Sequence, residues 1–388
     1  MGDDMPLISV VMITYQHEKY IAEAIQSILV QTFEDFELII VNDGSTDRTD
    51  EIIRSFQDDR IKYIYQENQG PSAASNNGIL ASRGKYIALM SGDDVCYPQR
   101  LEIQYQYLNN SGKKIVFSWV DFIDDDSQLF IGEHFAQNYF NHPHRTRAEI
   151  LNWFFMKGNY LCAITVLVEK EILLEFGLFN LASIQLQDFD MWIKVVKKYD
   201  IWLIEEKLVK YRIRSNGNNL SSDPANSIRS IFEGYQIYKN ILDNVSIELF
   251  KSSFSEYIKH PEFQEGYEYE LEKAFLYLSH SFTSSQSICT EKLFELLQNE
   301  EILFVAKSKY SFGLPELYQL TKDTDITNSK KQTEIEKLQA QLYQTQIELE
   351  RSQNTVTAME TSKFWKIRRY WFRIKELLGI KLKINEQV

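Results

Sequence analysis

The chain has 388 residues, of which 44% are hydrophobic, and its 55 acidic against 42 basic side chains give a formal net charge of −13. This composition is typical of a globular protein and excludes a disordered chain. The negative balance argues against a general nucleic-acid binder, which needs a broad basic surface. The length predicts two or so folded units, or one large domain with appendages.

Cysteine usage and the start of the chain indicate a reducing compartment. The three cysteines lie far apart, with neither pairing nor metal-ligand spacing: Cys96, Cys162 and Cys289. The first four residues lead directly into a strand-like segment, unlike a signal peptide. The longest apolar run, 160–168, is roughly half of what a membrane-spanning helix needs. We expect a cytoplasmic protein, either free or peripheral on the inner face of the plasma membrane.

Strand-like and helix-like segments alternate at the start of the chain. Apolar, β-branched runs predict strands at 7–14, 36–41, 61–65 and 86–90. Apolar stripes at helical spacing predict helices at 18–30, 46–56 and 71–82. This alternation implies parallel βαβ units with helices on the faces of the sheet, so the predicted fold class is α/β. Ligands of such sheets lie beyond the carboxyl ends of the strands.

The pattern changes further along the chain. It becomes mixed from about residue 147 and mainly helical from about residue 227. We predict four segments: an α/β domain over 1–225, a helical region over 226–325, a coiled coil over 326–360 and a basic tail over 361–388.

A heptad seam supports the coiled coil. Apolar and small polar residues recur at alternating steps of three and four: Ile335, Leu338, Leu342, Thr345, Leu349, Ser352, Val356 and Met359. The seam predicts a homo-oligomer, and a single solvated helix is the alternative because two seam positions are polar.

The tail differs in charge from the rest of the chain. Residues 361–388 hold eight basic and two acidic side chains, a net charge of +6, so the remainder carries −19. On a helix, one face gathers apolar residues: Phe364, Ile367, Trp371, Ile374 and Leu378. The opposite face carries Lys366, Arg369 and Arg373. This composition is typical of a helix on an anionic membrane surface, and a helix packed on the body is the alternative.

Acidic residues stand where the predicted strands end, and neither a P-loop nor a G-x-G-x-x-G motif is present. Asp43 ends the second strand within Asn42-Asp43-Gly44-Ser45-Thr46-Asp47. A carboxylate there can accept hydrogen bonds from a base or a ribose. Capping of the next helix is the alternative for this motif.

The fourth strand is followed by Asp93-Asp94. Two adjacent carboxylates are costly unless a positive charge neutralises them, and Mg²⁺ typically binds one or two protein carboxylates together with substrate phosphates. The pair therefore predicts a site for a metal-bound diphosphate, with a polar turn as the alternative.

Two further groups follow. Asp188 and Asp190 stand at a predicted helix start, where one could cap the helix and the other act as a general base. Arg212 and Arg214 could offset the charge of a diphosphate, although spacing alone favours ordinary surface arginines. The histidines show no metal-ligand spacing.

Taken in order, these residues resemble the family 2 glycosyltransferases of the GT-A fold, over about residues 6–220. The matching segments are ISVVMITY at 8–15, DFELIIVNDGSTD at 35–47, GKYI at 84–87, DD at 93–94, QDFDMW at 187–192 and YR at 211–212. The resemblance implies a GT-A nucleotide-sugar-binding domain with a mainly parallel sheet. It also implies inversion at the sugar by a single in-line displacement.

The resemblance assigns the nucleotide contacts residue by residue. Thr14 and Tyr15 would line the pocket of the nucleobase, with Asp43 bonding the base and Asn68 nearby. The implied donor is a nucleotide-diphosphate sugar, expected to be a UDP-sugar. The implied acceptor is a glycan or a lipid-linked molecule.

The resemblance also assigns the chemistry. Asp93 would meet the ribose or the metal, and Asp94 would ligate Mg²⁺ or Mn²⁺ on the diphosphate. Asp188 would deprotonate the acceptor hydroxyl. Arg212 or Arg214 would help to hold the departing diphosphate.

Two departures from the family pattern concern the diphosphate contact. Many members carry Arg where this chain has Ala74-Ser75, and His where Arg214 stands. The heptad segment and basic helix resemble the tails of some bacterial surface-polysaccharide glycosyltransferases. The alternatives are a sugar nucleotidylyltransferase, whose Gly-rich N-terminal loop is missing after Ile13, and a catalytically silent coiled-coil scaffold.

Overall fold

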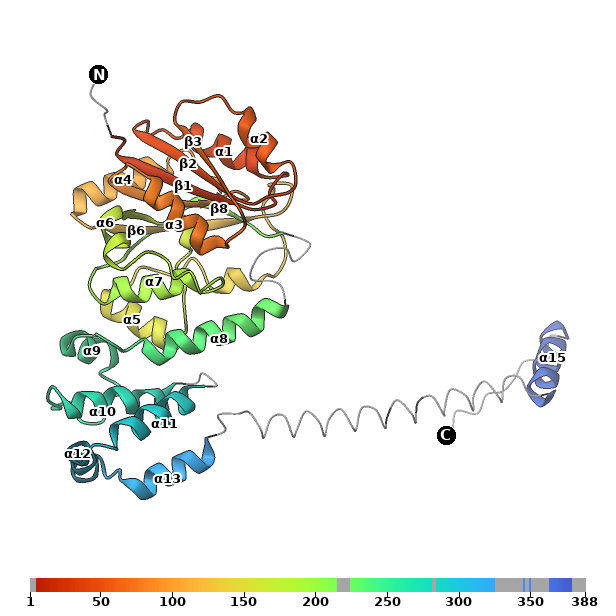
Figure 1. Ribbon diagram of the computed structural model, residues 1–388. Coiled ribbons are helices and arrows are strands. Elements are labelled where there is room, and N and C mark those ends of the chain that lie inside the picture. The colour runs from red at the N-terminus through yellow and green to blue at the C-terminus, as the bar shows by residue number, and fades with distance from the viewer. Residues whose placement is uncertain are drawn as a thin grey trace. The chain divides into compact units, whose positions relative to one another are not determined.

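The computed structural model describes residues 5–214, 224–280, 284–324, 345, 349 and 363–378. Contacts between residues divide the chain into two units, Met1–Leu317 and Tyr318–Val388. The first unit contains a sheet with its helices, followed by further helices (Figure 1).

The described residues form one sheet of eight strands: β1 (Ile8–Thr14), β2 (Phe36–Asp43), β3 (Ile61–Gln66), β4 (Tyr86–Ser91), β5 (Val95–Cys96), β6 (Ile115–Ile123), β7 (Leu167–Glu169) and β8 (Trp202–Arg212). Their order is β3-β2-β1-β4-β7-β6-β8-β5. Strands β1 to β4 are parallel, β7 is antiparallel to β4 and β6, and β8 is parallel to β6. The sheet is therefore mixed and mainly parallel.

The register brings three strand ends together. Thr14 of β1 pairs with Asn42 of β2, and Ile13 pairs with Ser91 of β4. Because parallel strands run in one direction, the residues that follow these pairs lie at one edge of the sheet.

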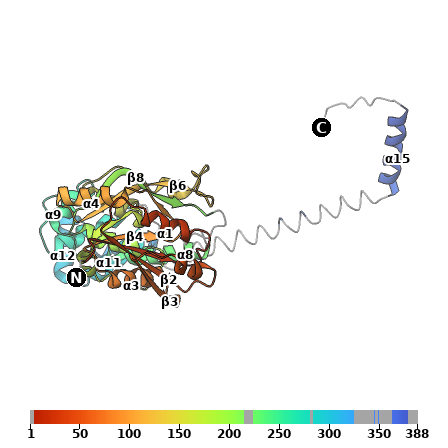
Figure 2. The ribbon, with the colours of Figure 1, turned by 90° about the horizontal axis from the view of Figure 1, so that it is seen from above.

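Helices cover both faces of the sheet, as expected for strands buried on both sides. Helices α1 (Ile21–Leu29), α2 (Thr49–Ser55) and α4 (Arg100–Ser111) contribute to the larger apolar core with β1, β2 and β4. Helix α3 (Pro71–Ala81) packs on the other face, where Ala74 meets Ile39 and Val41. Figure 2 shows α1 and α3 on opposite sides of the strands.

Helix α3 approaches the sheet closely at Gly78. A Cβ atom added there would lie 2.4 Å from Cγ1 of Val11, so only a glycine fits without displacing the strand.

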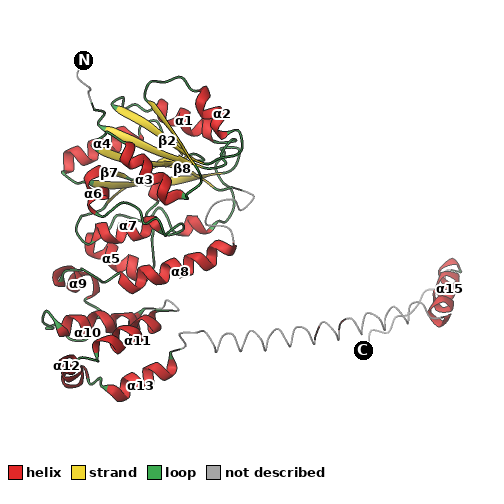
Figure 3. Ribbon diagram, viewed as in Figure 1, coloured by secondary structure: helices red, strands yellow, loops and turns green. Residues whose placement is uncertain are grey.

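The later helices follow in chain order (Figure 3). They are α5 (Arg147–Met156), α6 (Lys170–Glu175), α7 (Gln187–Val196), α8 (Pro224–Asn240), α9 (Ile247–Phe254), α10 (Tyr267–Leu276), α11 (Ser285–Leu296), α12 (Glu300–Tyr310), α13 (Leu314–Asp323) and α15 (Lys363–Leu377). Short 3-10 turns lie at Phe135–Asn138, Ala163–Thr165 and Tyr277–Ser279.

The predicted α/β fold with a mainly parallel sheet is confirmed, and so is the helical character after residue 227. The helix expected over 46–56 is shorter, beginning at Thr49. The reason is that residues 45–47 form a turn whose groups bond to Gln16 and Glu18. The predicted domain boundary at 225 falls at the start of α8, and the boundaries stay predictions.

Two predictions concern the end of the chain. Apart from residues 345 and 349, the predicted coiled coil over 326–360 lies outside the described residues. Within the tail, the expected helix is present as α15. None of the helices in the described residues is long and apolar enough to cross a membrane.

Candidate active site

Asp43 at the end of β2 organises the segment that leads into α3. Its carboxylate accepts hydrogen bonds from Gln66 Nε2 at 2.7 Å and from the backbone N–H groups of Gln69 and Gly70, each at 2.9 Å. The exposed Asn68 lies in this segment, against Gly44. Gly44 has a φ of +78° and a Cβ added there would lie 2.7 Å from the Asn68 nitrogen, so a glycine is required. Asp43 and Asn68 are thus brought together, as predicted.

The turn after β1 packs against the turn after β2. Gln16 has a φ of +56°, and its side-chain oxygen accepts hydrogen bonds from the N–H groups of Thr46 and Asp47, each at 3.1 Å. Thr14 is buried, whereas Tyr15 is 46% exposed and its ring is open to a ligand. Both residues lie at the sheet edge predicted for the nucleobase.

A buried histidine that the sequence reasoning passed over joins this edge to β4. His17 Nδ1 lies 3.2 Å from Thr14 Oγ1, and its Nε2 lies 3.6 Å from Asp93 Oδ2. Arg214 Nη1 lies 3.8 Å from the same oxygen. Burial lowers the pKa of His17, with the Asp93 charge opposing the effect. Its position three residues after a strand end was the only signal in the sequence.

Asp94 is buried at the end of the loop after β4. One of its oxygens accepts the N–H of Arg212 at 2.7 Å. Burial and the neighbouring Asp93 charge raise the pKa of Asp94 well above its ordinary range, although Arg212 and Arg100 oppose the shift.

Arg212 is directed into the protein. Its guanidinium donates to the carbonyls of Asp93 at 2.7 Å and Asp124 at 2.5 Å, and forms an ion pair with Glu23 at 2.8 Å. The group also lies over the ring of Tyr20, 4.7 Å from its centroid. These contacts join β8 to α1 and to the loop after β6. Of the two arginines, Arg214 is the one whose guanidinium approaches the Asp93 carboxylate.

Asp188 lies in the first turn of α7. Its carboxylate accepts hydrogen bonds from Asn159 Nδ2 at 2.9 Å and from the Phe189 N–H at 2.8 Å. Burial raises the pKa of Asp188 to about 6, and the charge of Glu233 on α8 adds to the shift while the hydrogen bonds oppose it. A carboxyl with this pKa is suited to general base catalysis near neutral pH.

Asp94 and Asp188 lie around one buried group, Cys162. Burial raises the pKa of this thiol well above its ordinary value, and the nearby charges of Asp94 and Asp188 raise it further. Two carboxylates that are 94 residues apart in the sequence thus act on the same thiol. Helix α3 is joined to the segment before α7, because the Asn76 side chain exchanges hydrogen bonds with the backbone of Phe179 at 2.8 and 2.9 Å.

Sequence reasoning missed Asn159 and Glu233, which contact Asp188 or the segment before it. Two amide atoms flanking Asp188, Gln185 Nε2 and Gln187 Oε1, are buried and have no hydrogen-bond partner among the described residues. Buried polar atoms of this kind are expected to find a partner. Isolated Asn, Glu and Gln residues carry no motif that would have identified them.

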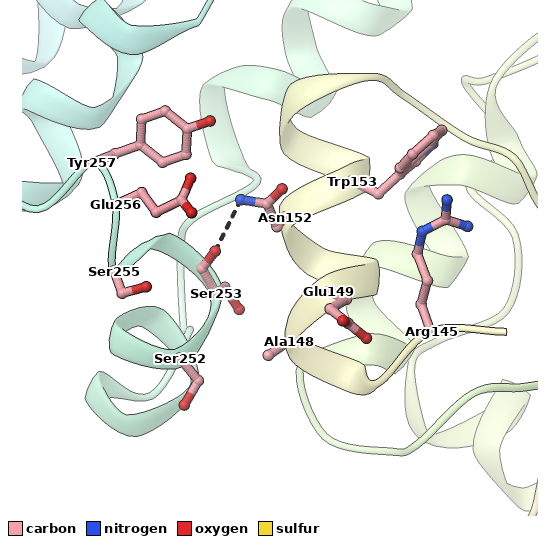
Figure 4. A pocket seen from close by; sticks show the side chains of 10 residues that line it. All are labelled: Arg145, Ala148, Glu149, Asn152, Trp153, Ser252, Ser253, Ser255, Glu256 and Tyr257. Carbon is pink, nitrogen blue, oxygen red and sulfur yellow. Dashed lines mark hydrogen bonds between the residues drawn. The ribbon is translucent and has the colours of Figure 1, made fainter. Parts of the chain in front are cut away.

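A cavity of about 320 Å³ lies away from the strand ends, between α5 and the segment from α9 to Tyr257 (Figure 4). Asn152 Nδ2 donates across it to the carbonyl of Ser253 at 2.9 Å. The guanidinium of Arg145 covers the Trp153 ring, 3.9 Å from its centroid. None of the predicted site residues lines this cavity.

Comparison with known proteins places the chain in a family. The model of glycosyl transferase family 2 matches residues 9–173. An uncharacterized glycosyltransferase of Methanocaldococcus jannaschii, MJ1057, is 36% identical over 244 residues, covering 61% of this chain and 81% of the relative. The chain belongs to glycosyl transferase family 2. A second relative, glycosyltransferase GlyG of Streptococcus pneumoniae, is 30% identical over 181 residues, which cover 45% of this chain and 60% of GlyG.

A solved structure agrees with the fold. The crystal structure of S. aureus TarS residues 1–349 in complex with UDP has a TM-score of 0.50 and 16% identity, covering 81% of this chain and 87% of TarS 1–349. The predicted family and the GT-A-like fold are thus confirmed. The family match includes Asp43, Asp93 and Asp94 and ends before Asp188. The metal, the residue roles and the surface-polysaccharide type stay predictions.

Proposed function

We propose that this glycosyltransferase moves a sugar from a UDP-sugar to a hydroxyl group of a glycan or lipid-linked acceptor, with inversion at the sugar. One observation carries the proposal: in a chain of glycosyl transferase family 2, the parallel register of β1, β2 and β4 brings Asp43, Asp93 and Asp94 to one edge of the sheet. Structural neighbours add support, because TarS 1–349 has been crystallised with UDP and with UDP-GlcNAc.

Asp188 acts as the general base. Its carboxylate takes the proton of the acceptor hydroxyl while the hydroxyl oxygen forms a bond to the anomeric carbon of the sugar. The bond between that carbon and the β-phosphate oxygen breaks at the same time, and UDP leaves with the electron pair. Attack opposite to the leaving group inverts the anomeric centre.

Asp94 and Asp93 fit a divalent cation. Both offer carboxylate oxygens, the hard ligands that Mg²⁺ and Mn²⁺ prefer, and they are adjacent in the loop after β4. The described residues contain no group of three or more such ligands, which suits a cation completed by substrate phosphates and water. When bound, the cation would neutralise charge on the diphosphate.

The remaining predicted residues have roles in nucleotide binding. Thr14, Tyr15 and Asn68 would surround the nucleobase, with Asp43 fixing the segment that carries Asn68 and offering its remaining lone pairs to the base. Arg214, close to Asp93, would face the diphosphate, whereas Arg212 supports the site from within.

A panel of UDP-sugars with Mn²⁺ tests the donor. UDP-glucose, UDP-galactose and UDP-N-acetylglucosamine are compared by thermal shift and by slow UDP release without an acceptor, with EDTA as the control. We expect one donor to raise the melting temperature and release UDP only with the metal. Release of pyrophosphate from UTP and a sugar phosphate would instead identify a sugar nucleotidylyltransferase. If no donor is turned over, the result would favour the catalytically silent scaffold over an enzyme.

The base is tested by a matched pair of substitutions in one helical turn. Asp188→Asn should lower the rate of UDP release by about 10²- to 10⁴-fold with UDP binding retained. Asp190→Asn removes a carboxylate that is ion-paired with Lys194 at 2.7 Å and should change the rate little. A wild-type rate in Asp188→Asn would contradict the assignment.

We further propose that α15 binds anionic membrane surfaces. Four of its apolar side chains are half or more exposed, namely Ile367, Trp371, Ile374 and Leu377, and Leu378 directly after the helix is exposed as well. Its basic residues outnumber the single acidic one, Glu376, and Lys375 lies over the Trp371 ring, 3.6 Å from its centroid. Apolar and basic groups on one helix suit the boundary between acyl chains and anionic headgroups, where a lipid-linked acceptor would lie.

Sedimentation with phosphatidylglycerol vesicles tests this second proposal. Deleting 361–388 or introducing Trp371→Ala should reduce binding, and added salt should weaken binding of the intact chain. Phe304→Ala, which removes an exposed aromatic ring from α12, is the control. Unchanged partitioning after the deletion would contradict the proposal.

We also propose that residues 326–360 form the contact of a homo-oligomer. Their heptad seam is the support. Sedimentation velocity should show a single chain when both Leu338→Asp and Leu342→Asp are introduced. An unchanged sedimentation coefficient would contradict this assignment.

A further inference from the structure

Helix α7, which carries Asp188, has no side-chain cap at its N-cap position. Leu186 occupies the N-cap position and forms no side-chain hydrogen bond to the helix start. Helix starts leave backbone N–H groups without partners, and Ser, Thr, Asp or Asn usually supplies the missing acceptor. The N-cap residue therefore does not hold the start of α7 by a side-chain hydrogen bond.

A carboxylate from another helix instead binds the segment that leads into α7. The Glu233 carboxylate on α8 accepts hydrogen bonds from the N–H groups of Ile184 and Gln185 at 2.9 Å each and of Leu186 at 2.8 Å. These groups form the segment directly before α7. Glu233 is only 5% exposed, so little water competes for its oxygens.

Close packing holds α8 in position. A Cβ atom added at Gly234 would lie 3.6 Å from Cδ1 of Leu186, so α8 touches the segment it binds. One helical turn further along α8, the rings of Tyr238 and Phe189 form an edge-to-face contact with their centroids 6.1 Å apart. The Tyr238 hydroxyl also donates a hydrogen bond to the carbonyl of Phe154 at 3.3 Å. Helix α8 is thus fixed against both α7 and α5.

The charge of Glu233 also affects the pKa of Asp188. Burial of a carboxylate is costly unless it is hydrogen-bonded, and three N–H groups meet this need. No ion pair of Glu233 with a lysine or arginine is found within the part of the chain that the structure describes. Its negative charge is therefore not cancelled there by a nearby cation, and it contributes to the raised pKa of Asp188.

We propose that Glu233 is a positioning residue for the transfer reaction, which sets the start of α7 and thereby the place of the Asp188 carboxylate. The inference rests on the proposed function, in which Asp188 is the base. It extends the catalytic arrangement to a helix that lies beyond the part of the chain matched by the family model. Two effects follow from one carboxylate: geometric alignment of the base, and an increase in its proton affinity.

Substitutions at Glu233 test the proposal in the full chain, with UDP release from the stabilising UDP-sugar as the assay. Glu233→Gln should lower kcat by about 10- to 100-fold, because misplacing a reacting group by about 1 Å costs this much. The KM of the donor should change by less than about twofold, since none of the residues predicted for the donor lies on α8. The acid limb of the pH–rate profile should move below about pH 6, because a negative charge near Asp188 is lost.

Two further variants control the test. Gln236→Ala removes an exposed side chain from the same helix and should keep kcat and the acid limb of the wild type. Glu233→Asp keeps the charge on a shorter side chain and should keep the acid limb nearer to the wild type than Glu233→Gln does. It also remains available if Glu233→Gln fails to fold. A lower melting temperature with unchanged kcat and acid limb would reduce Glu233 to a structural role and overturn the proposal.

Hydrogen exchange separates this inference from the proposed function. Amides in a peptide spanning residues 184–190 should exchange faster in Glu233→Gln and at the wild-type rate in Gln236→Ala. If Asp188→Asn keeps full activity, the base assignment fails whatever Glu233 does. If Asp188→Asn is inactive and neither exchange nor kcat responds to Glu233→Gln, the positioning role alone fails.

Discussion

The two halves of the sheet unit are held together by contacts of different range. In the first half, residues 5–96, β1 to β4 alternate with α1 to α3, and these four strands lie side by side in the order β3-β2-β1-β4. In the second half, residues 100–240, β7 pairs antiparallel with β4 and β6, and the start of α7 depends on Glu233 from α8. The first half places the residues predicted for the nucleobase and the metal, and the second places the predicted base and the two predicted arginines. Local sequence therefore dictates the donor side, whereas the base side depends on contacts between distant segments.

The largest expected effect comes from Arg212, which joins the two halves. Arg212→Met leaves Glu23 and the carbonyls of Asp93 and Asp124 without their donor. Loss of one partner from a buried, hydrogen-bonded pair should lower the free energy of unfolding by about 3 kcal/mol. Urea unfolding followed by tryptophan fluorescence measures this change.

A control on the same strand sharpens the test. Lys207→Met removes an ion pair with Asp121 at 2.7 Å, but the lysine is half exposed, so the expected loss is below about 1 kcal/mol. Equal losses for the two variants would show that Arg212 does not join the halves.

The next effect concerns pH and the second half alone. Asp188 must be ionised to accept a proton, and burial raises its pKa to about 6. The rate of UDP release should therefore fall about tenfold for each pH unit below this value. Because the folded-state pKa is raised, protonated Asp188 stabilises the fold in acid, and this contribution disappears as the pH rises through about 6.

Two profiles measure these trends. The rate profile is compared with donor binding over the same range, which should change little. Melting temperatures of the wild type and Asp188→Asn are compared from pH 4 to 7, and the difference between them should vary near pH 6. A flat rate profile down to pH 5 would show that Asp188 is not the base.

The smallest effect belongs to the first half. Gly78→Ala places a Cβ 2.4 Å from Val11 Cγ1, an overpacking only partly offset by the better helix propensity of alanine. We expect a net loss of about 1 kcal/mol, measured by urea unfolding. Adding Val11→Ala should make the double variant less destabilised than the sum of the single changes, and strict additivity would contradict direct contact.

Much of the site could be predicted from sequence. Asp43 and the Asp93-Asp94 pair stand directly after apolar runs, and the register of parallel strands then brings them to one edge. His17 and Asn159 could not be found in this way. Each is a single polar residue in a turn, and its role depends on a partner that only folding brings near: Asp93 for His17 and Asp188 for Asn159.

The sequence by itself determined the alternation of strands and helices, the family and the acidic residues at the strand ends, because these follow from periodicity and from short local motifs. Tertiary structure alone decided that Arg212 is directed inward and that Glu233 of α8 binds the segment before α7. The physical reason is the same in both cases. A charged side chain is placed by the hydrogen-bond partners available within a buried environment, and those partners come from segments far apart in the chain.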